Sequence, residues 1–319
     1  MPHAASNPPA IVAVVGTTAS GKTRLGVALA QALGGEVISA DSQLVYRELN
    51  IGTAKPTPGE TAGIPHHLID CVPPTEPYTV ARYRTEASGV LRSLLAAGKT
   101  AVVVGGTGLY IRALLQEEFF PDVPPDAEFR AGMKALADRE GAQALHARLQ
   151  TADPERAAAL HPNDVVRVIR ALEIIHHTGG PVPTRRQGLQ LPGVIHWVGL
   201  HYEDRDRMRA VMDERIEAML AAGWLAEVQA LMHRYGADPP AHALTVAHGY
   251  PEWVKHLRGE LDFEAARDQI RINIHQYGRR QLTFFRPNPA IHWLAVDSCH
   301  SPGGFTKLLN ASMAGMAAV

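Results

Sequence analysis

Eight residues near the N-terminus constrain this chain more than any others. They fit the phosphate-binding-loop pattern G-x-x-x-x-G-K-[ST] and read Gly16, Thr17, Thr18, Ala19, Ser20, Gly21, Lys22 and Thr23. The apolar run 11–15 before the loop predicts a buried strand, and the run 25–33 after it has helical spacing. In that context the glycines allow a tight turn whose N–H groups face an anion, and the helix N-terminus adds a positive dipole end. The sequence therefore predicts a binding site for a diphosphate or a triphosphate.

Two side chains of this loop have separate expected roles. Lys22 supplies a mobile positive charge, and the hydroxyl group of Thr23 suits a magnesium ion. Loops of this kind hold the phosphates of nucleotides in other proteins. The competing explanation is a chance match on a glycine-rich turn, which the flanking strand and helix argue against.

Composition limits the remaining possibilities. The chain has 319 residues, enough for one large domain or two modest ones, and a net charge of −1. A nucleic-acid site must therefore be a local cluster and not a property of the whole surface. The two cysteines, Cys71 and Cys299, have no partner spacing that indicates a zinc site or a disulfide, so we expect a reducing cytoplasm. We find neither a signal peptide nor an apolar run long enough to span a membrane.

The order of strand and helix patterns predicts an α/β fold, with a parallel P-loop sheet flanked by helices. The expected strands are 11–15, 36–40, 100–104, 194–200 and 291–296. Segment 122–190 shows no strand pattern and reads as an all-helical insert. The catalytic core is then 10–121 plus 191–319, including the C-terminal helices. Segment 55–65, with three prolines and two glycines, is expected to be loop.

Two of the expected strands end in polar or glycine-rich turns. Asp41 and Ser42 follow the strand 36–40, and the glycine-rich turn 105–108, which contains Thr107, follows the strand 100–104. Ligands in open parallel sheets bind outside the carboxyl ends of the strands, so Asp41 should face the phosphate loop. There it can act as a general base or as a magnesium partner, with Asp70 a weaker candidate acid. The alternatives are a capping aspartate and an ordinary tight turn.

Positive charge gathers locally near the C-terminus. Residues 267–286 contain five arginines against one acid, with Tyr277, Phe284 and Phe285 interleaved. Arginines beside aromatic rings suit phosphate contacts combined with base stacking. A second cluster contains Arg167, Arg170, Arg185 and Arg186. A solvated helix face is the alternative explanation for either cluster.

Several motifs together resemble the bacterial tRNA dimethylallyltransferase family, over roughly residues 11–290. The similar stretches are the phosphate loop, Ile38-Ser39-Ala40-Asp41-Ser42, Ile51-Gly52-Thr53-Ala54-Lys55-Pro56, Gly63-Ile64-Pro65-His66-His67, Gly105-Gly106-Thr107-Gly108-Leu109-Tyr110, Pro162-Asn163-Asp164 and Arg279-Arg280-Gln281-Leu282-Thr283-Phe284-Phe285-Arg286. The chain departs from the family at Leu44, where many members have Gln, at His248, where Ile is more usual, and at Val211, where Arg is common.

The resemblance implies transfer of a dimethylallyl group from dimethylallyl diphosphate to N6 of the adenine next to the anticodon, position 37, of a tRNA. Asp41 would be the base, Lys22 and Mg²⁺ would stabilise the leaving diphosphate, and Thr107 would line the channel mouth. We expect a cytoplasmic monomer that binds the anticodon stem-loop. The implied tRNA-binding residues are Asp41, Ser42, Gln43, Leu44, Thr107, Arg130, Val166, Arg167, Val168, Ile169, Arg170, His248, Gly249, Tyr250, Arg279, Arg280, Gln281, Thr283, Phe284 and Arg286.

Three other functions use parts of the same pattern. A small-molecule P-loop kinase would use the loop and Asp41 but not the arginine clusters. An adenylate isopentenyltransferase would perform the same chemistry on a free nucleotide and would need no tRNA surface. A phosphate-loop protein that binds RNA without catalysis would leave Asp41 without a role.

Overall fold

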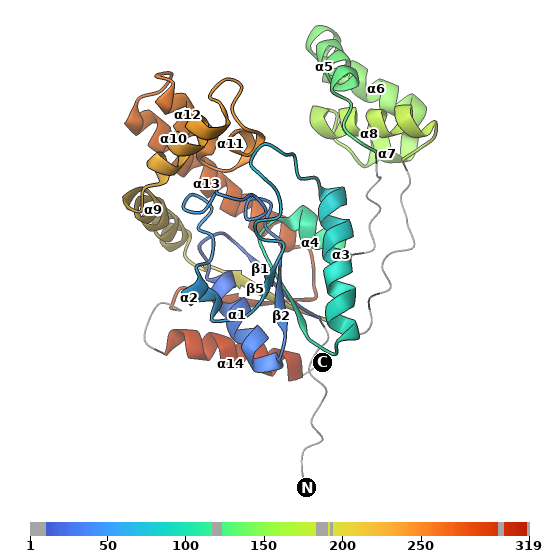
Figure 1. The fold of residues 1–319 in the computed structure, drawn as a ribbon. Coiled ribbons are helices and arrows are strands. Elements are labelled where there is room, and N and C mark those ends of the chain that lie inside the picture. Colours follow the sequence, from blue (N-terminus) through green and yellow to red (C-terminus); the bar gives the residue numbers. More distant parts are fainter. Residues whose placement is uncertain (1–10, 117–122, 183–190, 192–193, 299–302, 318–319) are drawn as a thin grey trace. The chain divides into compact units, whose positions relative to one another are not determined.

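The structure is a computed structural model that describes residues 11–116, 123–182, 191, 194–298 and 303–317. The chain divides into two compact units. The main unit comprises residues 1–115 and 191–319, and the helical unit comprises residues 116–190. Each unit is described by itself below (Figure 1).

The main unit is built on a six-stranded sheet in which all pairings are parallel. The strand order is β3-β2-β4-β1-β5-β6. The strands are β1 Ile11–Gly16, β2 Glu36–Ser39, β3 His66–His67, β4 Ala101–Val104, β5 Ile195–His201 and β6 Ile291–Ala295. Helices flank this sheet, so the predicted α/β fold class is confirmed (Figure 1).

The central strands are apolar along their whole length because both faces of the sheet are covered. Every residue of β1 and β4 is buried. On one face, Val12 and Val14 pack with Leu25 and Leu29 of α1 in the main hydrophobic core. Continuous apolar strands of this kind are typical of parallel sheets, in which crossover helices shield both faces from water.

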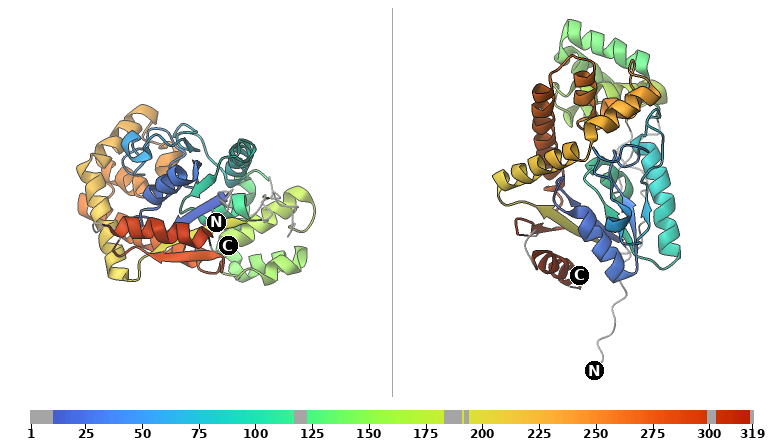
Figure 2. Two further views of the ribbon diagram at one scale, coloured as in Figure 1. Left: turned by 90° about the horizontal axis from the view of Figure 1, so that it is seen from below. Right: turned by 60° about the vertical axis from the view of Figure 1, so that its left-hand side comes forward.

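Ten helices of the main unit fall within the described residues. They are α1 Lys22–Leu33, α2 Pro58–Thr61, α3 Val80–Ala96, α4 Gly108–Leu115, α9 Arg205–Ala221, α10 Trp224–Tyr235, α11 His242–Val246, α12 Tyr250–Leu257, α13 Phe263–Phe285 and α14 Gly304–Ala317. Helix α14 packs along α1 (Figure 2). At this contact the Arg24 guanidinium group lies 3.8 Å from the ring centroid of Phe305. Helix α13 contacts β1, α4 and α9, which brings the C-terminal part of the chain to the strand that carries the phosphate loop.

The helical unit contains the four helices α5 Ala127–Glu140, α6 Ala142–Ala152, α7 Pro154–Ala158 and α8 Val165–Thr178. Its core is formed by apolar side chains that include Leu145, Leu149 and Val168, all without exposed area. Glu173 of α8 is also completely buried, and it receives hydrogen bonds from Arg130 and Arg170. Although burial favours the neutral acid, these bonds and one from the Asp126 N–H lower the pKa of Glu173 to about 2.

The structure corrects the secondary structure expected for segment 55–65. The short helix α2 forms there because the Thr57 side chain accepts from the Glu60 N–H while the Glu60 side chain accepts from the Thr57 N–H, which completes a capping box. Pro58 stands at the first helical position, where no N–H is needed. The two-residue strand β3 and the helices α11, α12 and α14 were also not expected. None of the helices among the described residues is long and apolar enough to cross a membrane.

Candidate functional site

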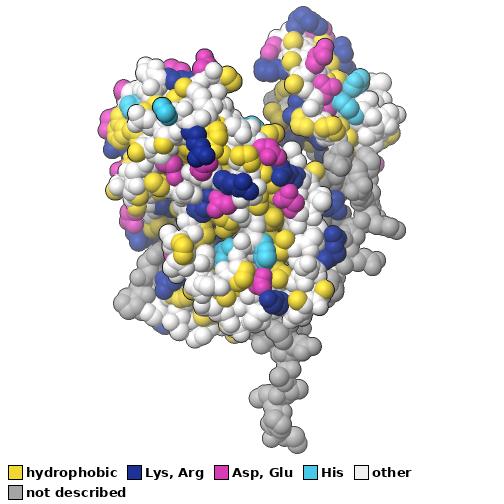
Figure 3. Space-filling model, viewed as in Figure 1, with side chains coloured by type: hydrophobic (Ala, Val, Ile, Leu, Met, Phe, Trp, Pro, Cys, Tyr) yellow, Lys and Arg dark blue, Asp and Glu magenta, His cyan; other side chains and the backbone are white. Residues whose placement is uncertain are grey.

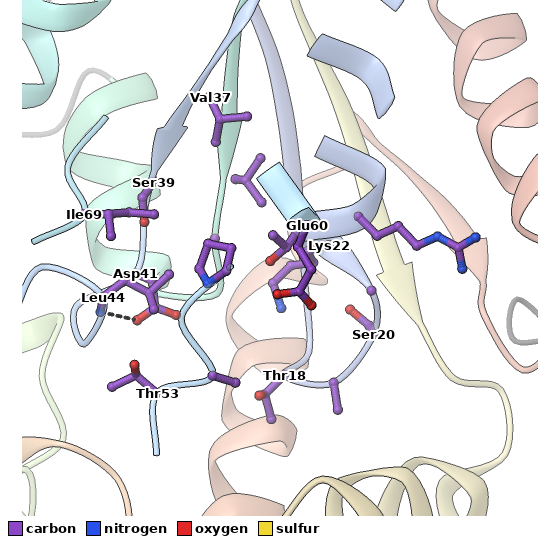
Figure 4. Close-up of a pocket in the computed structure, with 18 of the residues that line it drawn as sticks. Thr18, Ser20, Lys22, Val37, Ser39, Asp41, Leu44, Thr53, Glu60 and Ile69 are labelled. Atoms are coloured by element: carbon purple, nitrogen blue, oxygen red, sulfur yellow. Dashed lines mark hydrogen bonds between the residues drawn. The ribbon is translucent and has the colours of Figure 1, made fainter. Parts of the chain in front are cut away.

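A cavity of about 380 Å³ opens at the carboxyl ends of β1, β2 and β4. Its walls come from the phosphate loop and α1, from the segment after β2, and from α9 and α13. The lining residues with polar or charged side chains include Thr18, Ser20, Lys22, Thr23, Asp41, Glu60, Arg215, Tyr277 and Gln281. Figure 4 shows Asp41 and Leu44 on one side of the cavity and Lys22, Glu60 and Ser20 on the other.

The phosphate loop forms the anion-binding part of this cavity. Gly21 has φ 84°, a left-handed conformation that favours glycine, and it precedes the first residue of α1. The Ser20 hydroxyl donates to the Thr17 carbonyl oxygen over 2.8 Å, and Lys22 Nζ donates to the same oxygen over 2.5 Å. The loop is therefore closed on itself, with its helix N-terminus facing the cavity.

Six of the eight residues predicted to bind diphosphate line the cavity, namely Thr18, Ala19, Ser20, Gly21, Lys22 and Thr23. The other two, Gly16 and Thr17, do not line it, and their part in binding diphosphate stays a prediction. A Cβ atom at Gly16 would lie 2.2 Å from the carbonyl oxygen of Leu200, so this glycine is needed for contact with β5. Thr17 is fully buried beneath the loop.

Three lysine or arginine residues line the cavity, namely Lys22, Arg24 and Arg215, and of these only Lys22 was predicted as a site residue. Burial lowers the pKa of Lys22 to about 7, an effect that Asp41 opposes and Arg215 reinforces. Burial also lowers the pKa of Arg215, while the charges of Asp41 and Glu60 raise it. No ion pair or hydrogen bond to the Arg215 side chain occurs within the described part of the chain. Its guanidinium group is therefore available to an anionic ligand.

Arg215 was not predicted, because the family resemblance indicated an arginine at position 211, where this chain has Val. Val211 is 8% exposed and belongs to the core beneath α9. Arg215 lies four residues later and therefore on the same face of this helix. The periodicity of α9 could have indicated this position, because Met208, Val211, Met212, Ile216 and Met219 mark the buried face next to it.

Asp41 and Thr107 lie together, on the segments that follow β2 and β4. Asp41 Oδ1 accepts hydrogen bonds from the backbone N–H groups of Gln43 at 2.8 Å and Leu44 at 3.4 Å. Among the described residues nothing hydrogen-bonds to Oδ2. The predicted position of Asp41 beside the phosphate loop is confirmed. One carboxylate oxygen is held by backbone groups, and the other is left for a substrate.

A side pocket of about 70 Å³ shares Asp41 and Arg215 with the main cavity. Its other walls combine the apolar side chains of Met212, Ile216, Met219 and Ile274 with the polar side chains of Gln43, Thr53, His248 and Tyr277. The rings of His248 and Tyr277 are 4.1 Å apart. Burial raises the pKa of Tyr277 and lowers the pKa of His248, so both rings are neutral near pH 7. The pocket suits an uncharged group beside two charged ones.

The other residues predicted to bind RNA in the main unit fall into two groups. The first group lies at the cavity: Ser42 hydrogen-bonds to Thr107, Leu44 lines the cavity, and Gln43 and His248 line the side pocket. The second group has exposed side chains on α13 or at its end, and consists of Arg279, Arg280, Thr283, Phe284 and Arg286. Gly249, Tyr250 and Gln281 have contacts within the protein instead, and their part in RNA binding stays a prediction. Gly249 packs on Trp224, and the buried Tyr250 hydroxyl donates to Glu227 over 2.7 Å. Gln281 is 4% exposed and bonds only within the protein.

The basic residues of α13 differ in their availability. Arg267 pairs with Glu264, and Arg271 pairs with Asp213 at 2.9 Å. Within the described residues no carboxylate pairs with Arg279, Arg280 or Arg286. Arg279 and Arg286 line a groove of about 290 Å³ with Arg205 and Arg209 of α9, which we call the outer groove. Elsewhere on the face of the main unit in Figure 3, basic and acidic side chains are interspersed.

The helical unit holds the remaining residues predicted to bind RNA. Val166 is 79% exposed, and Arg167 is exposed and pairs with Asp164 at 3.3 Å. The side chains of Val168 and Ile169 lie in the hydrophobic core, so their part in RNA binding stays a prediction. Arg130 and Arg170 are occupied by Glu173, although both keep exposed area. Arg185 and Arg186 lie outside the described residues.

Other sequence-based candidates have structural roles. Asp70 pairs with Lys55 at 2.5 Å and does not line the cavity. Cys71 is a free cysteine, and Cys299 lies outside the described residues. No group of three or more His, Cys, Asp or Glu side chains that could hold a metal ion occurs in the part of the chain that the structure describes.

Comparison with known proteins agrees with this geometry. The family model described as IPP transferase matches residues 44–288, which is most of the chain. The chain belongs to the tRNA dimethylallyltransferase family. A second family model, described as isopentenyl transferase, matches residues 9–72, the part that contains the phosphate loop and Asp41.

Individual relatives match this chain over most of the length of both proteins. A tRNA dimethylallyltransferase of Symbiobacterium thermophilum is 44% identical over 286 residues, covering 89% of this chain and 88% of the relative. One of Desulforudis audaxviator is 41% identical over 311 residues and covers 96% and 98%. The crystal structure of a tRNA isopentenylpyrophosphate transferase from Bacillus halodurans is 36% identical with a TM-score of 0.70 and covers 96% of each chain. The resemblance found in the sequence motifs is thus confirmed over the whole fold.

Proposed function

We propose that this chain transfers the dimethylallyl group of dimethylallyl diphosphate to N6 of the adenine next to the anticodon, position 37, of a tRNA. The observation that carries the proposal is one cavity in which the phosphate loop and Arg215 face Asp41. The loop and Arg215 suit a diphosphate, and Asp41 suits the acceptor amine. The relatives named for this reaction support the same function.

The leaving group is the first part of the proposed mechanism. The bond between the allylic carbon and the diphosphate oxygen breaks, and the negative charge on the diphosphate grows as it does. Lys22, Arg215 and the N–H groups of the loop lie where they can stabilise that charge. Preorganised donors of this kind contribute about 2–4 kcal/mol each to the transition state.

The acceptor is the second part. The lone pair of adenine N6 is delocalised into the ring, so the amine becomes a good nucleophile only as its proton is removed. Asp41 Oδ2 is free to take that proton while Oδ1 is held by Gln43 and Leu44. The new bond joins N6 to the allylic carbon. The apolar side chains of the side pocket keep water away from the electron-poor carbon, and the adenine must leave its stack to enter.

Magnesium is a further part of the proposal. The Thr23 side chain lines the cavity one residue after Lys22, as the phosphate-loop chemistry requires of a metal ligand. Because the described residues contain no cluster of three carboxylates or imidazoles, diphosphate oxygens and water would supply most of the other ligands. The bound ion would neutralise part of the charge on the leaving diphosphate.

With a tRNA as the proposed acceptor, we can also propose the part of the tRNA that is bound and the cellular compartment. We propose the anticodon stem-loop as the part of the tRNA that is bound, with the exposed arginines at the end of α13 contacting its phosphates. A tRNA acceptor places the reaction in the cytoplasm. We also propose that a single chain is active, which light scattering of the active protein tests.

The test is to weigh reaction products. The protein is incubated with dimethylallyl diphosphate, magnesium and either an anticodon stem-loop RNA or adenosine monophosphate. We expect the RNA to gain one dimethylallyl group and the free nucleotide to remain unchanged. Modification of the nucleotide alone would identify an adenylate isopentenyltransferase. Transfer of phosphate from ATP to a small molecule, without any prenyl transfer, would identify a kinase.

A further inference from the structure

Gln281 is the one side chain of α13 that hydrogen-bonds to the backbone of two active-site loops among the described residues. Its Oε1 accepts from the Thr18 N–H over 2.7 Å, across 263 positions of sequence. Its Nε2 donates to the Gly106 carbonyl oxygen over 3.1 Å, across 175 positions. Thr18 belongs to the phosphate loop after β1, and Gly106 belongs to the turn after β4. One amide group thus connects both loops to α13.

The fit around this amide leaves little room for movement. Gln281 is 4% exposed, so water does not compete for these bonds. A Cβ atom at Gly106 would lie 2.0 Å from Gln281 Nε2. The Gln281 amide therefore occupies the space that any larger residue at position 106 would need. A displacement of α13 at this point must move Thr18 and Gly106 with it.

The same stretch of α13 bears the residues that face the acceptor. Arg279 and Arg280 directly precede Gln281 and are exposed. Tyr277 lies one turn earlier and lines both pockets. Thr107 directly follows Gly106 in the turn after β4. Thr107 in turn accepts from the Ser42 N–H at 3.0 Å, next to Asp41. Because Gly106 and Thr107 are neighbours in one turn, the bonds of Gln281 and of Thr107 together connect the phosphate loop and α13 to the segment that holds Asp41.

We propose that Gln281 is a positioning residue that couples RNA binding on α13 to diphosphate binding in the phosphate loop. This inference rests on the proposed function, because it takes the acceptor to be an RNA that contacts the exposed arginines of α13. When RNA fixes this helix, Gln281 fixes the Thr18 N–H and hence the loop geometry that receives the diphosphate. By linkage, bound diphosphate strengthens RNA binding by the same factor.

The test compares two glutamines of the same helix. Gln281→Met keeps the length of the side chain and removes both hydrogen bonds. Gln269→Met is the matched control, because Gln269 is exposed and its Nε2 donates over 3.0 Å only to Asn273, within α13. Titration calorimetry measures the dissociation constant of inorganic diphosphate with and without saturating anticodon stem-loop RNA. Inorganic diphosphate carries no group to transfer, so both ligands stay unchanged during the titration.

In the unmodified protein and in Gln269→Met, we expect RNA to tighten diphosphate binding about tenfold, within the usual range of coupling between two sites. In Gln281→Met each ligand should still bind alone, while the ratio of the two dissociation constants falls toward one. An unchanged ratio in Gln281→Met, or no effect of RNA in the unmodified protein, would overturn the inference. Absence of prenyl transfer to RNA would instead refute the proposed function, so the two failures are distinguishable.

A second measurement uses only the unmodified protein, in case Gln281→Met does not fold. Amide hydrogen exchange is followed in the peptide that covers residues 16–23, with RNA but without diphosphate. We expect RNA to slow exchange in this peptide, because the Thr18 N–H is held by a helix that RNA has fixed. Exchange at an unchanged rate in this loop, with slower exchange in α13, would contradict the coupling.

Discussion

The hydroxyl group of Thr107 accepts a hydrogen bond of 3.0 Å from the backbone N–H of Ser42. It also donates to the Ser42 hydroxyl over 3.3 Å. These bonds join the turn after β4 to the segment after β2, on which Asp41 is already held by the N–H groups of Gln43 and Leu44. The candidate base is therefore fixed from both sides before any substrate binds, as preorganised catalysis requires.

Replacing Asp41 by Asn tests its role as a base. Asn keeps the shape of the side chain but cannot accept the proton of N6. We expect RNA and diphosphate binding to persist while the single-turnover rate at saturating substrates falls by about 10²–10⁴-fold. Asp70→Asn is the control, because Asp70 pairs with Lys55 away from the cavity. If Asp41 instead binds magnesium, higher metal concentration will restore much of the activity of Asp41→Asn. An unchanged rate would exclude both roles.

Replacing Arg215 by Met removes a charge that nothing else in the described cavity neutralises by a direct ion pair. We expect a loss of about 2–4 kcal/mol in transition-state stabilisation, read from kcat/KM for dimethylallyl diphosphate. Arg215→Lys should recover part of it. The control is Arg207→Met on the same helix, whose side chain pairs with Glu214 at 3.3 Å outside the cavity. Equal effects of Arg207→Met and Arg215→Met would assign Arg215 a structural role only.

Binding of diphosphate should depend on pH through Lys22. Burial lowers the pKa of Lys22 to about 7 in the free protein, and a bound diphosphate must raise it. Below pH 7 the amine is already charged, so this contribution to affinity is complete. Above pH 7 binding must take up a proton, and affinity should fall by up to about tenfold per pH unit. Calorimetry at pH 8 in buffers of different ionisation enthalpy measures the uptake. Lys22→Met, which has no proton to bind, should abolish this component.

Binding of RNA should weaken as salt increases. Arg279, Arg280 and Arg286 pair with no carboxylate among the described residues, so three phosphate contacts predict a log–log slope of about −2 for single-stranded contacts. Arg280→Ala should make this slope shallower by up to about one unit. Arg267→Ala serves as the comparison and should change it less, because Arg267 pairs with Glu264. Slopes that do not differ between the two variants would remove α13 from the RNA interface.

The stability of the helical unit should depend on the negative charge of Glu173. Glu173→Gln removes the charge that pairs with Arg130 and Arg170, and because both arginines keep exposed area the expected cost is about 1–3 kcal/mol. Glu140→Gln, at an exposed pair with Arg139, should change stability by less than about 0.5 kcal/mol. Hydrogen exchange in α6 and α8 measures both variants. Similar exchange in the two would show that the buried pair adds no stability.

The same carboxylate predicts acid sensitivity of that unit. Hydrogen bonds from Arg130, the Asp126 N–H and Arg170 outweigh the effect of burial and lower the pKa of Glu173 to about 2. In the unfolded chain, the carboxyl group of a glutamate has a pKa of about 4.3. The stabilisation is therefore complete above pH 4.3 and is lost as pH falls toward 2. The Glu173→Gln variant should lack this part of the acid transition.

Local patterns were sufficient for five of the six strands and for the phosphate loop, but not for the two-residue strand β3. The strands before Gly16 and Gly105 are continuous apolar runs, which is how a strand buried on both faces reads. The position of Asp41 followed from the rule that the carboxyl ends of parallel strands share one edge. The capping box at Thr57 and Glu60 was equally local, but the prolines and glycines around it predicted a loop instead.

By itself, then, the sequence determined the P-loop fold, the family and the pair formed by the phosphate loop and Asp41, because each depends on neighbours within a short stretch. Only the tertiary structure decided the roles of Arg215 and Gln281. Both lie on helices remote in sequence from the loop, and which side of a helix meets the cavity depends on how the helix packs. Gln281 was expected at the RNA surface because segment 279–286 resembles the basic-aromatic helix of the family, yet its position on the inner face of α13 directs its amide to Thr18 and Gly106. A helix turns about 100° per residue, so adjacent residues of one motif can serve opposite sides of the same helix.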